Sequence, residues 1–597
     1  MSAKPPKTGA SALALDTAAR ATPAGMAGGA VGEAGSKQAL AQLAAAMAEL
    51  KAVAIQPMLQ RATDALRADD HVTGEKWAQQ AVDRDPTSGF GWYLLGIAHE
   101  RAGHWSGSIA AYEKALELLP DQAEVANDLG RLAFRLGMKP QAEKLFRHFL
   151  VRHPGHIEGV NNLVCAIRDQ QRYEEAIEAL RPTLQANPTS SMLWNTMGTV
   201  VAEQGDYVNA QIFFQEALRL EPDFPKARYN LGNAHLILGD AAAALEDCEA
   251  ALKDITAESD RQMMRLSRST ILINLGRIGE GWDEYEARLD PQFSEVMHFL
   301  CDKQPWSPGY DLRGRNMLVF AEQGLGDEVL FANLLPDLLE ALGPDGHLTL
   351  AVEPRLVSLF QRSFPTVEVG EHKTHMIQGY NVRHAQFLKD PDSIEVYAPL
   401  GSLLCEFRRT LDDFPSRKNF LTADPDRVAY WTKVLDEQAP QGPKIGLLWK
   451  SLSTRDARHR FFSPFEQWKP VLTAPGATFV NMQYGDCSAE LELARRELGV
   501  KIWQPPGIDL KQDLDDIAAL CCALDLTIGF SNATLNIGAA CGAPAWLIST
   551  PGAWPRLGTA RYPWYPQVRT FTPQKFGEWD PVMETVGEAL AGFIAER

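Results

Sequence analysis

Residues 86–120 read PTSGFGWYLLGIAHERAGHWSGSIAAYEKALELLP and hold one complete copy of a unit that recurs through the first half of the chain. Its two flanking prolines belong to a series in which each proline follows the one before by 34 residues: Pro86, Pro120, Pro154, Pro188 and Pro222. A fixed period of that length is the sequence signature of an array of stacked helix pairs. The first half of the chain is therefore predicted to be a helical array.

Other positions stay in phase with the prolines when units begin at residues 55, 89, 123, 157, 191 and 225. The eighth residue is small in five of these six units, and the twentieth residue is small in all six. The unit resembles the tetratricopeptide repeat, in which small residues let two helices pack closely. The proline closes the second helix because it has no N–H to donate. We predict six such repeats over residues 55–258, and arrays of this kind present extended surfaces for binding other proteins.

The segments on either side of the array differ from it. Residues 1–50 are dominated by Ala, Gly, Lys and Ser and contain no Phe, Trp or Tyr, so they lack the large side chains of a packed core. We expect a disordered leader there, with an Ala-rich helix from Lys37 onward. Residues 259–305 keep helical spacing, but the closing proline moves to Pro291. This segment is predicted to be capping helices and a linker.

Charge and composition disfavour several classes of protein. The net charge of −18 argues against nucleic acid as the main partner. We find no apolar run of the roughly 20 residues that a membrane span needs, and no secretory signal, so we expect a cytoplasmic protein without a membrane span. Eight cysteines without a CxxC pair fit reduced thiols better than a disulfide frame or a zinc site. We therefore expect no metal.

From about Trp306 the pattern changes to short apolar runs that alternate with amphipathic helices, which is typical of parallel α/β folds. A strand over residues 317–320 is followed by a turn containing Gly324 and Gly326, and then by a helix. Strand, glycine turn and helix open a Rossmann-like half, in which the helix start favours an anion. A tight reversal capped by Asp327 explains the same residues, and for this motif alone it is the better explanation.

A second α/β half follows, with strands predicted over residues 444–449, 478–483 and 526–529. After the last of these, Ser531, Asn532, Ala533 and Thr534 open a helix. Hydroxyls, backbone amides and the helix dipole at such a turn suit a nucleotide phosphate. A well-capped structural helix explains the turn equally well, because Ser and Asn are ordinary capping residues.

Together the two halves resemble one family. The sequence EQGLGD at residues 322–327, which follows Trp306, is similar to the opening motif of two-Rossmann (GT-B) glycosyltransferases that are fused to tetratricopeptide arrays in bacteria. Residues 524–543 resemble their donor-nucleotide segment, and Trp564 with Tyr565 resembles their aromatic corner. The cap GEGWDEYEAR at residues 279–288 is typical of such fusions. The layout as a whole resembles the flagellin glycosyltransferases of alphaproteobacteria.

The resemblance implies the fold class α + α/β, with an N-terminal α-solenoid followed by a GT-B enzyme. Residues 306–425 would form the acceptor-side half, and residues 426–597 the half that binds the nucleotide-sugar. It also implies inverting transfer of a nonulosonic, pseudaminic-acid-type sugar from a CMP-linked donor to Ser or Thr of flagellin, with no cofactor besides the nucleotide-sugar co-substrate. Two alternatives stay open. One is a UDP-sugar enzyme like the O-GlcNAc transferases, with other acceptors, and the other is a repeat-based chaperone or scaffold with an inactive transferase domain.

The same resemblance suggests the catalytic residues. Asp327 stands where heptosyltransferases carry their general base. Lys450, at the end of a strand, is a candidate for stabilising the leaving phosphate, although the family usually has a small residue there. Residues 451–462 form the densest basic run, including Arg455 and His459, and a solvated loop is the competing explanation for it. The predicted donor-binding residues are Gln323, Gly324, Gly326, Arg458, Arg460, Gln483, Ser531, Asn532, Ala533 and Thr534.

The array also suggests an acceptor surface. The fifth and sixth residues of each unit lie on the first helix, which lines the concave face in this fold, and many of them are asparagines. Similar ladders in protein O-GlcNAc transferases grip a peptide backbone through side-chain amides. A groove lined with polar residues facing solvent explains the pattern equally well, and a folded helical acceptor would use Phe134 and tyrosines as anchors. The predicted acceptor-binding residues are Tyr93, Asn127, Asn161, Asn162, Asn195, Tyr229 and Asn230.

Overall fold

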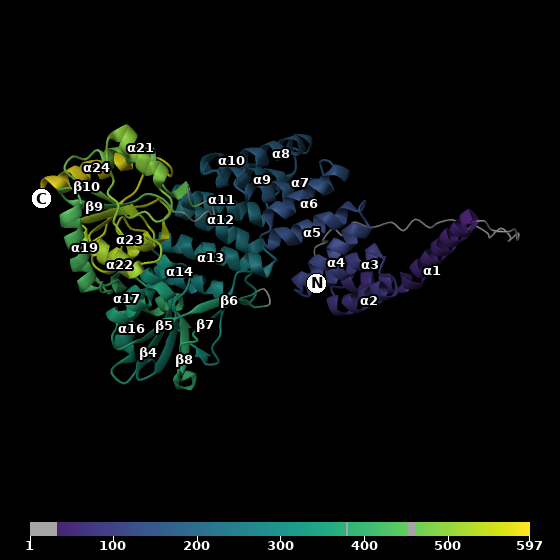
Figure 1. Ribbon diagram of the computed structural model, residues 1–597, viewed down its shortest axis with the longest axis horizontal. Coiled ribbons are helices and arrows are strands. Elements are labelled where there is room, and N and C mark those ends of the chain that lie inside the picture. The colour runs from purple at the N-terminus through teal and green to yellow at the C-terminus, as the bar shows by residue number, and fades with distance from the viewer. Residues whose placement is uncertain (1–32, 378–379, 452–457, 459) are drawn as a thin grey trace. The chain divides into compact units, whose positions relative to one another are not determined.

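The computed structural model describes residues 33–377, 380–451, 458 and 460–597 (Figure 1). It divides into two compact units, Met1–Leu119 and Pro120–Arg597. The described part of the first unit consists of α1 (Glu33–Arg67), α2 (His71–Arg84), α3 (Gly89–Arg101) and α4 (Trp105–Leu118). Their apolar side chains form a core of their own, to which Ala62, Ala78 and Leu94 contribute.

The second unit begins with four more helix pairs. They are α5 (Ala123–Arg135) with α6 (Lys139–Arg152), α7 (Ile157–Arg168) with α8 (Tyr173–Ala186), α9 (Ser191–Glu203) with α10 (Tyr207–Leu220), and α11 (Pro225–Leu238) with α12 (Ala241–Asp254). Each first helix begins at the first residue of its 34-residue unit. The periodic prolines follow the second helices, as Pro154 follows Arg152 at the end of α6. The array is therefore a tetratricopeptide solenoid.

The small eighth residue of the repeat is required by the large twenty-fourth residue. A Cβ atom added at Gly130 would lie 2.7 Å from the ring of Phe146, and one at Gly198 would lie 2.5 Å from the ring of Phe214. Both rings are buried. The aromatic ring of the second helix thus occupies the space left by the glycine of the first, which explains why these positions keep phase with the prolines.

The Ala-rich helix expected from Lys37 onward is present as the first half of α1, and it begins earlier, at Glu33. Residues 33–50, which lie within the segment that we assigned to a disordered leader, are therefore helical. The segment Lys37–Arg67 of α1 is also long and apolar enough to cross a membrane by length and composition alone, and it is the one such helix within the described residues. Ile55, Met58 and Leu59, in the later part of α1, are buried in the first repeat, whereas only 6% of the apolar window itself is buried.

The array ends in α13 (Glu258–Asn274), α14 (Ile278–Tyr285) and the short 3-10 helix η1 (Glu286–Leu289). Trp282 of α14 is buried, and its indole N–H donates to the carbonyl of Arg408 at 2.9 Å. Arg288 of η1 is buried as well and donates to the carboxylate of Glu322 at 2.6 and 3.0 Å. These capping helices thereby join the array to the first α/β half.

Two five-stranded parallel sheets follow. The first has the order β2-β8-β3-β4-β5, built from β2 (Gln304–Pro305), β3 (Asn316–Phe320), β4 (His347–Val352), β5 (Glu368–Glu371) and β8 (Val396–Pro399). The second has the order β10-β9-β11-β12-β13, built from β9 (Lys444–Leu448), β10 (Thr478–Asn481), β11 (Leu526–Phe530), β12 (Ala545–Ile548) and β13 (Arg569–Phe571).

A small third sheet was not anticipated from the sequence. It has the order β1-β7-β6, with β1 (Met297–Phe299) parallel to β7 (Tyr380–His384), and β6 (Lys373–Ile377) antiparallel to β7. The strand β1 leaves the capping helices, so this sheet connects the end of the array to residues that lie between β5 and β8 in the chain.

Helices cover the two large sheets. They are α15 (Leu325–Phe331), α16 (Leu335–Leu342), α17 (Val357–Ser363), α18 (Leu404–Phe407), α19 (Pro425–Gln438), α20 (Lys469–Leu472), α21 (Ser488–Leu498), α22 (Leu514–Ala523), α23 (Ala533–Ala540) and α24 (Trp579–Ala595). One continuous apolar core includes residues of β3 and β4 from the first half and of α22 and α23 from the second. Figure 1 shows α22 and α23 between β9 and the first sheet. The two halves are therefore packed together rather than merely tethered.

Candidate active site

The structure brings together two turns that lie about two hundred residues apart in the chain. α15 follows β3 and α23 follows β11, and the starts of the two helices face each other. The side-chain amide of Asn536 donates to the carbonyl of Gly326 at 3.3 Å. A Cβ atom at Gly326 would lie 3.5 Å from the backbone nitrogen of Ala533. The glycine thus permits close approach of the two turns, as the strand, glycine turn and helix pattern predicts.

The carboxyl group of Asp327 lies in the turn that opens α15. Its carboxylate accepts the backbone N–H of Gly324 at 3.2 Å, so the simple capping role is present. Burial raises its pKa to about 6, while that hydrogen bond and the charge of Arg458 act in the opposite direction. Nearby Glu322 and Glu328 raise the pKa further. A carboxyl group that changes protonation near neutral pH suits proton abstraction from a hydroxyl.

Two further residues at this junction escaped the sequence analysis. Tyr562 is buried, and its hydroxyl donates to the side-chain carbonyl of Asn536 at 3.3 Å. Burial raises the pKa of Tyr562, and a hydrogen bond with Ser531 opposes that shift. Asn536 stands one helical turn after Asn532, so helical spacing within α23 is the signal that could have identified it. The position of Tyr562 in the sequence gives no signal that its side chain reaches this turn.

The turn before α15 holds an unusual backbone. Gln323 has a φ of +66°, a left-handed conformation that is uncommon for a residue other than glycine. Gln323 and Gly324 are both exposed. Non-glycine residues in this region are strained and persist only where the surrounding structure holds them, which is common at ligand sites.

The start of α23 combines a helix cap with an unused donor. The side-chain oxygen of Asn532 accepts the N–H of Leu535 at 2.9 Å, as an ordinary N-cap does. Its side-chain nitrogen is buried and has no hydrogen-bond partner among the described residues. Ser531 is exposed, Ala533 is half-buried, and Thr534 is buried. The turn therefore has both the structural role and a donor suited to an anion.

Gln483 has a structural role in the second half. Its side-chain oxygen accepts the backbone N–H groups of Trp449 and Lys450 at 3.1 and 3.0 Å, which joins the chain after β10 to the chain after β9. It also contributes to a cavity of about 540 Å³ at the carboxyl ends of these strands, where open α/β sheets bind ligands. Other residues lining the cavity are Asn481, Tyr484, Asp486, Gln504 and Asp509.

The predicted cations lie in different surroundings. The ammonium of Lys450 forms an ion pair with Glu490 of α21. Arg460 faces the array: it donates to Glu203 at 2.8 Å and to the carbonyl of Ala202 at 3.2 Å. Arg458 is exposed and close enough to Asp327 to affect its pKa. Arg455 and His459, also named from the sequence, lie outside the described residues.

The predicted acceptor residues of the second unit mostly bond to one another. Each link joins one repeat to the next: Asn162 donates to Asn127 at 3.4 Å, Thr196 to Asn161 at 2.5 Å, and Asn230 to Asn195 at 2.9 Å. Tyr229 packs against the buried cluster of Ala251, Ile255 and Met264. In the first unit, Tyr93 lies between the rings of Phe90 and Tyr112. The asparagines therefore form a ladder, part of whose hydrogen-bonding capacity is used within the array.

Comparison with known proteins identifies relatives of the whole chain and of its array. A tetratricopeptide repeat model matches residues 93–157, 162–220 and 196–260. The chain is 48% identical to Protein FlbA of Caulobacter vibrioides over 566 residues, which cover 95% of both chains. Over 175 residues it is 27% identical to the human Protein O-mannosyl-transferase TMTC1, covering 23% of this chain and 20% of that protein. Over 142 residues it is 26% identical to the BBSome complex member bbs-4 of Caenorhabditis elegans, covering 24% of this chain and 31% of that protein.

Among solved structures, similar chains include a tetratricopeptide repeat protein from Parabacteroides merdae. It is 17% identical with a TM-score of 0.35, covering 39% of this chain and 92% of that chain. The tetratricopeptide protein TTC0263 of Thermus thermophilus is 24% identical with a TM-score of 0.28, covering 31% of this chain and 100% of that chain.

Proposed function

The chain belongs to the FlbA family, and on that premise we propose that it is a protein O-glycosyltransferase of the GT-B kind. Its repeats recruit flagellin, and its two α/β halves transfer a nonulosonic, pseudaminic-acid-type sugar from a CMP-linked donor to Ser or Thr. The observation that carries the proposal is the contact between two turns, each of which follows the middle strand of a parallel sheet: Asn536 of α23 bonds to Gly326, the residue before Asp327, at 3.3 Å. The sugar and the acceptor rest on the sequence resemblance to flagellin glycosyltransferases.

The proposed reaction is a single displacement. The carboxylate of Asp327 takes the proton of the acceptor hydroxyl, and the hydroxyl oxygen bonds to the anomeric carbon as the bond from that carbon to the phosphate oxygen of CMP breaks. The unpartnered amide of Asn532 and the N–H groups at the start of α23 bind the leaving phosphate. Displacement from the opposite face inverts the anomeric centre.

We assign the nucleoside to the cavity beside Gln483. Its volume of about 540 Å³ lies within the range of small-ligand sites. The paired side-chain amides of Asn481 and Gln504, joined by a hydrogen bond of 2.8 Å, contribute to it, and amides of this kind can recognise the polar edge of a base. The position of the cavity supports the assignment, because open α/β sheets bind ligands at the carboxyl ends of their parallel strands.

The decisive experiment is the mass of flagellin from cells that carry or lack the gene. We expect the mass increment of a nonulosonic acid on flagellin from wild-type cells and none from the deletion strain. Complementation with Asp327→Asn should fail to restore the increment. Complementation with Asp345→Asn, an exposed carboxylate in the turn before β4, should restore it fully. Normal modification by Asp327→Asn would remove Asp327 as the base.

Thermal protection separates the enzyme alternatives. A ligand that binds the folded state raises the unfolding temperature, so a CMP-linked nonulosonic acid should protect the purified protein, and a UDP-linked sugar should not. Protection by the UDP-linked sugar alone favours the O-GlcNAc-transferase-like alternative. Protection by neither donor, combined with unmodified flagellin in wild-type cells, favours the scaffold alternative.

A further inference from the structure

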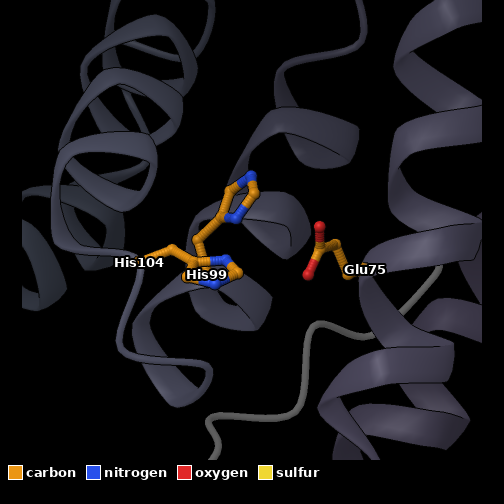
Figure 2. Close-up of side chains that lie close together, drawn as sticks. All are labelled: Glu75, His99 and His104. Atoms are coloured by element: carbon orange, nitrogen blue, oxygen red, sulfur yellow. The ribbon is translucent and has the colours of Figure 1, made fainter. Parts of the chain in front are cut away.

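Three side chains converge in the first unit, far along the chain from the candidate active site. Glu75 comes from α2, His99 from α3, and His104 from the turn that precedes α4. One ligand atom of each lies within 4.8 Å of the others. Figure 2 shows the carboxylate of Glu75 directed toward the two imidazoles. The cluster thus joins the first repeat to the second.

The backbone, rather than side-chain hydrogen bonds, positions the two imidazoles. Gly103 has a φ of +75°, and the N–H of His104 donates to the carbonyl of His99 at 2.8 Å. This reversal places the two rings 5.8 Å apart, centre to centre. The ring of His99 rests on Gly107, where an added Cβ atom would lie 3.4 Å from the imidazole. A methyl group at position 107 would therefore be in van der Waals contact with this ring.

These side chains have no other evident role. His104 occupies the N-cap of α4 but makes no capping bond, whereas the ring of His156, at the N-cap of α7, accepts the N–H of Gly159 at 3.2 Å. The Nδ1 atom of His99 is buried and has no hydrogen-bond partner in the part of the chain that the structure describes. Within the described residues, Glu75 forms no side-chain hydrogen bond or ion pair. A buried imidazole nitrogen without a partner calls for an explanation such as a bound ion.

The donor set has the chemistry of a metal site. Two imidazoles and one carboxylate suit Zn²⁺ in tetrahedral coordination, with the fourth position open. Zinc–nitrogen bonds of about 2 Å need ligand atoms roughly 3.4 Å apart, and rotation of the exposed His104 side chain can close the remaining gap.

We propose that Glu75, His99 and His104 form a binding site for a divalent transition metal, for which Zn²⁺ is the best-matched ion. The metal ties α2 of the first repeat to the α3–α4 turn of the second. Its fourth position is left to water or to a ligand atom of a bound partner. This proposal differs from the expectation of no metal, which rested on motif spacing. Glu75, His99 and His104 match no recognised spacing, because the ligands come from three separate elements.

Zinc titration of the untagged, full-length protein tests the proposal. Metals are first removed from each protein with a chelator. The wild-type protein should then bind one equivalent of Zn²⁺. This tight binding should be lost in the His99→Gln, His104→Gln and Glu75→Gln variants. Loss of a group that only supports a metal ligand lowers metal affinity by ~10–100-fold. Loss of a direct ligand should therefore lower the zinc affinity of each variant by at least this factor. His347→Gln, which changes an exposed histidine at the start of β4, should bind as the wild type does.

Cobalt supplies a second measurement. Co²⁺ in tetrahedral coordination absorbs visible light, so the wild-type protein should gain this absorption and the His104→Gln protein should lack it. Because His104 is exposed, its replacement should leave the fold intact, which circular dichroism can check. Equal zinc stoichiometry and affinity in wild-type and His104→Gln proteins, or no zinc uptake by the wild type, would overturn the proposal. Neither result depends on transferase activity.

Discussion

At the scale of single residues, the protonation of Asp327 links stability to function. Its pKa is raised from 3.8 to about 6, so the folded state binds this proton more tightly than the unfolded state does. That contribution to stability is fully present below pH 3.8 and is lost as the pH rises through about 6. The wild-type protein therefore carries a destabilising charge at neutral pH.

Replacing Asp327 by asparagine should remove this penalty. We expect Asp327→Asn to raise the free energy of unfolding by on the order of 1–3 kcal/mol near pH ~8, because one pKa unit corresponds to about 1.4 kcal/mol. Near pH ~4.5 the gain should be clearly smaller. Urea unfolding at both pH values measures it, with Asp345→Asn as the unaffected control. An equal gain at both pH values would contradict burial as the cause of the raised pKa.

The same group predicts the pH profile of transfer. Only the ionised carboxylate can accept the acceptor proton, so kcat/KM should be constant above a pH of about 6 and fall about tenfold per pH unit below it. Initial rates of flagellin modification at constant ionic strength give the profile. A profile without an inflection in that region would assign proton transfer to another group.

Residue-level sequence reasoning locates a residue well where the signal is local, and poorly where its contacts come from distant parts of the chain. The strand-turn-helix pattern identified the two turns that hold Asp327 and Asn532, which the structure brings together. Arg460 was selected for its charge, but its partner Glu203 lies 257 positions away in the array. Nothing in the basic run distinguishes an arginine that meets phosphate from one that meets a carboxylate.

At the scale of elements, the buried pair Arg288 and Glu322 connects η1 to the end of β3. The side chains are 4% and 3% exposed, and Glu322 also accepts the N–H of Gly401 at 2.8 Å. We expect Arg288→Met to destabilise the protein by about 3–5 kcal/mol, because it leaves a buried carboxylate without its cation. The double change Arg288→Met with Glu322→Met should recover much of this loss.

Equilibrium unfolding of the single and double variants measures the coupling. Arg277→Met serves as the matched control, because Arg277 pairs with Glu280 at an exposed position where such pairs contribute at most about 1 kcal/mol. A loss from Arg288→Met no larger than that from Arg277→Met would show that the buried pair does not hold the cap to the first sheet.

Elements also differ in how far sequence alone predicts them. The helices α3 to α12 begin at intervals that follow the 34-residue frame, and three of the units share the packing of a glycine against an aromatic ring, as Gly198 packs against Phe214. Sheet order has no such local signal. The central position of β3 and the small sheet β1-β7-β6 depend on crossovers between distant segments. Alternating apolar runs identify strands but not their neighbours.

At the scale of the whole molecule, the array and the two α/β halves are not independent modules. The sequence alone suggests that the repeats could be deleted without affecting the donor site. Within the second unit, however, Arg460 bonds to the end of α9, and the side chain of Asn274 donates to the carbonyl of Gly552 at 3.3 Å. A Cβ atom at Gly552 would lie 2.1 Å from the carbonyl oxygen of Leu236, so the loop after β12 touches α11 directly.

The boundary at residue 119 is therefore the better place to divide the protein, because the first unit has its own core. We expect residues 120–597 to fold and to show the same thermal shift with a CMP-linked nonulosonic acid as the full chain. Residues 259–597 should lose that shift, because removing α5–α12 exposes the surfaces that meet Arg460 and Gly552. Differential scanning fluorimetry of the three proteins decides between the boundaries. A normal shift in residues 259–597 would show that the repeats are dispensable for the donor site, and loss of the shift in residues 120–597 would show that the first unit supports it.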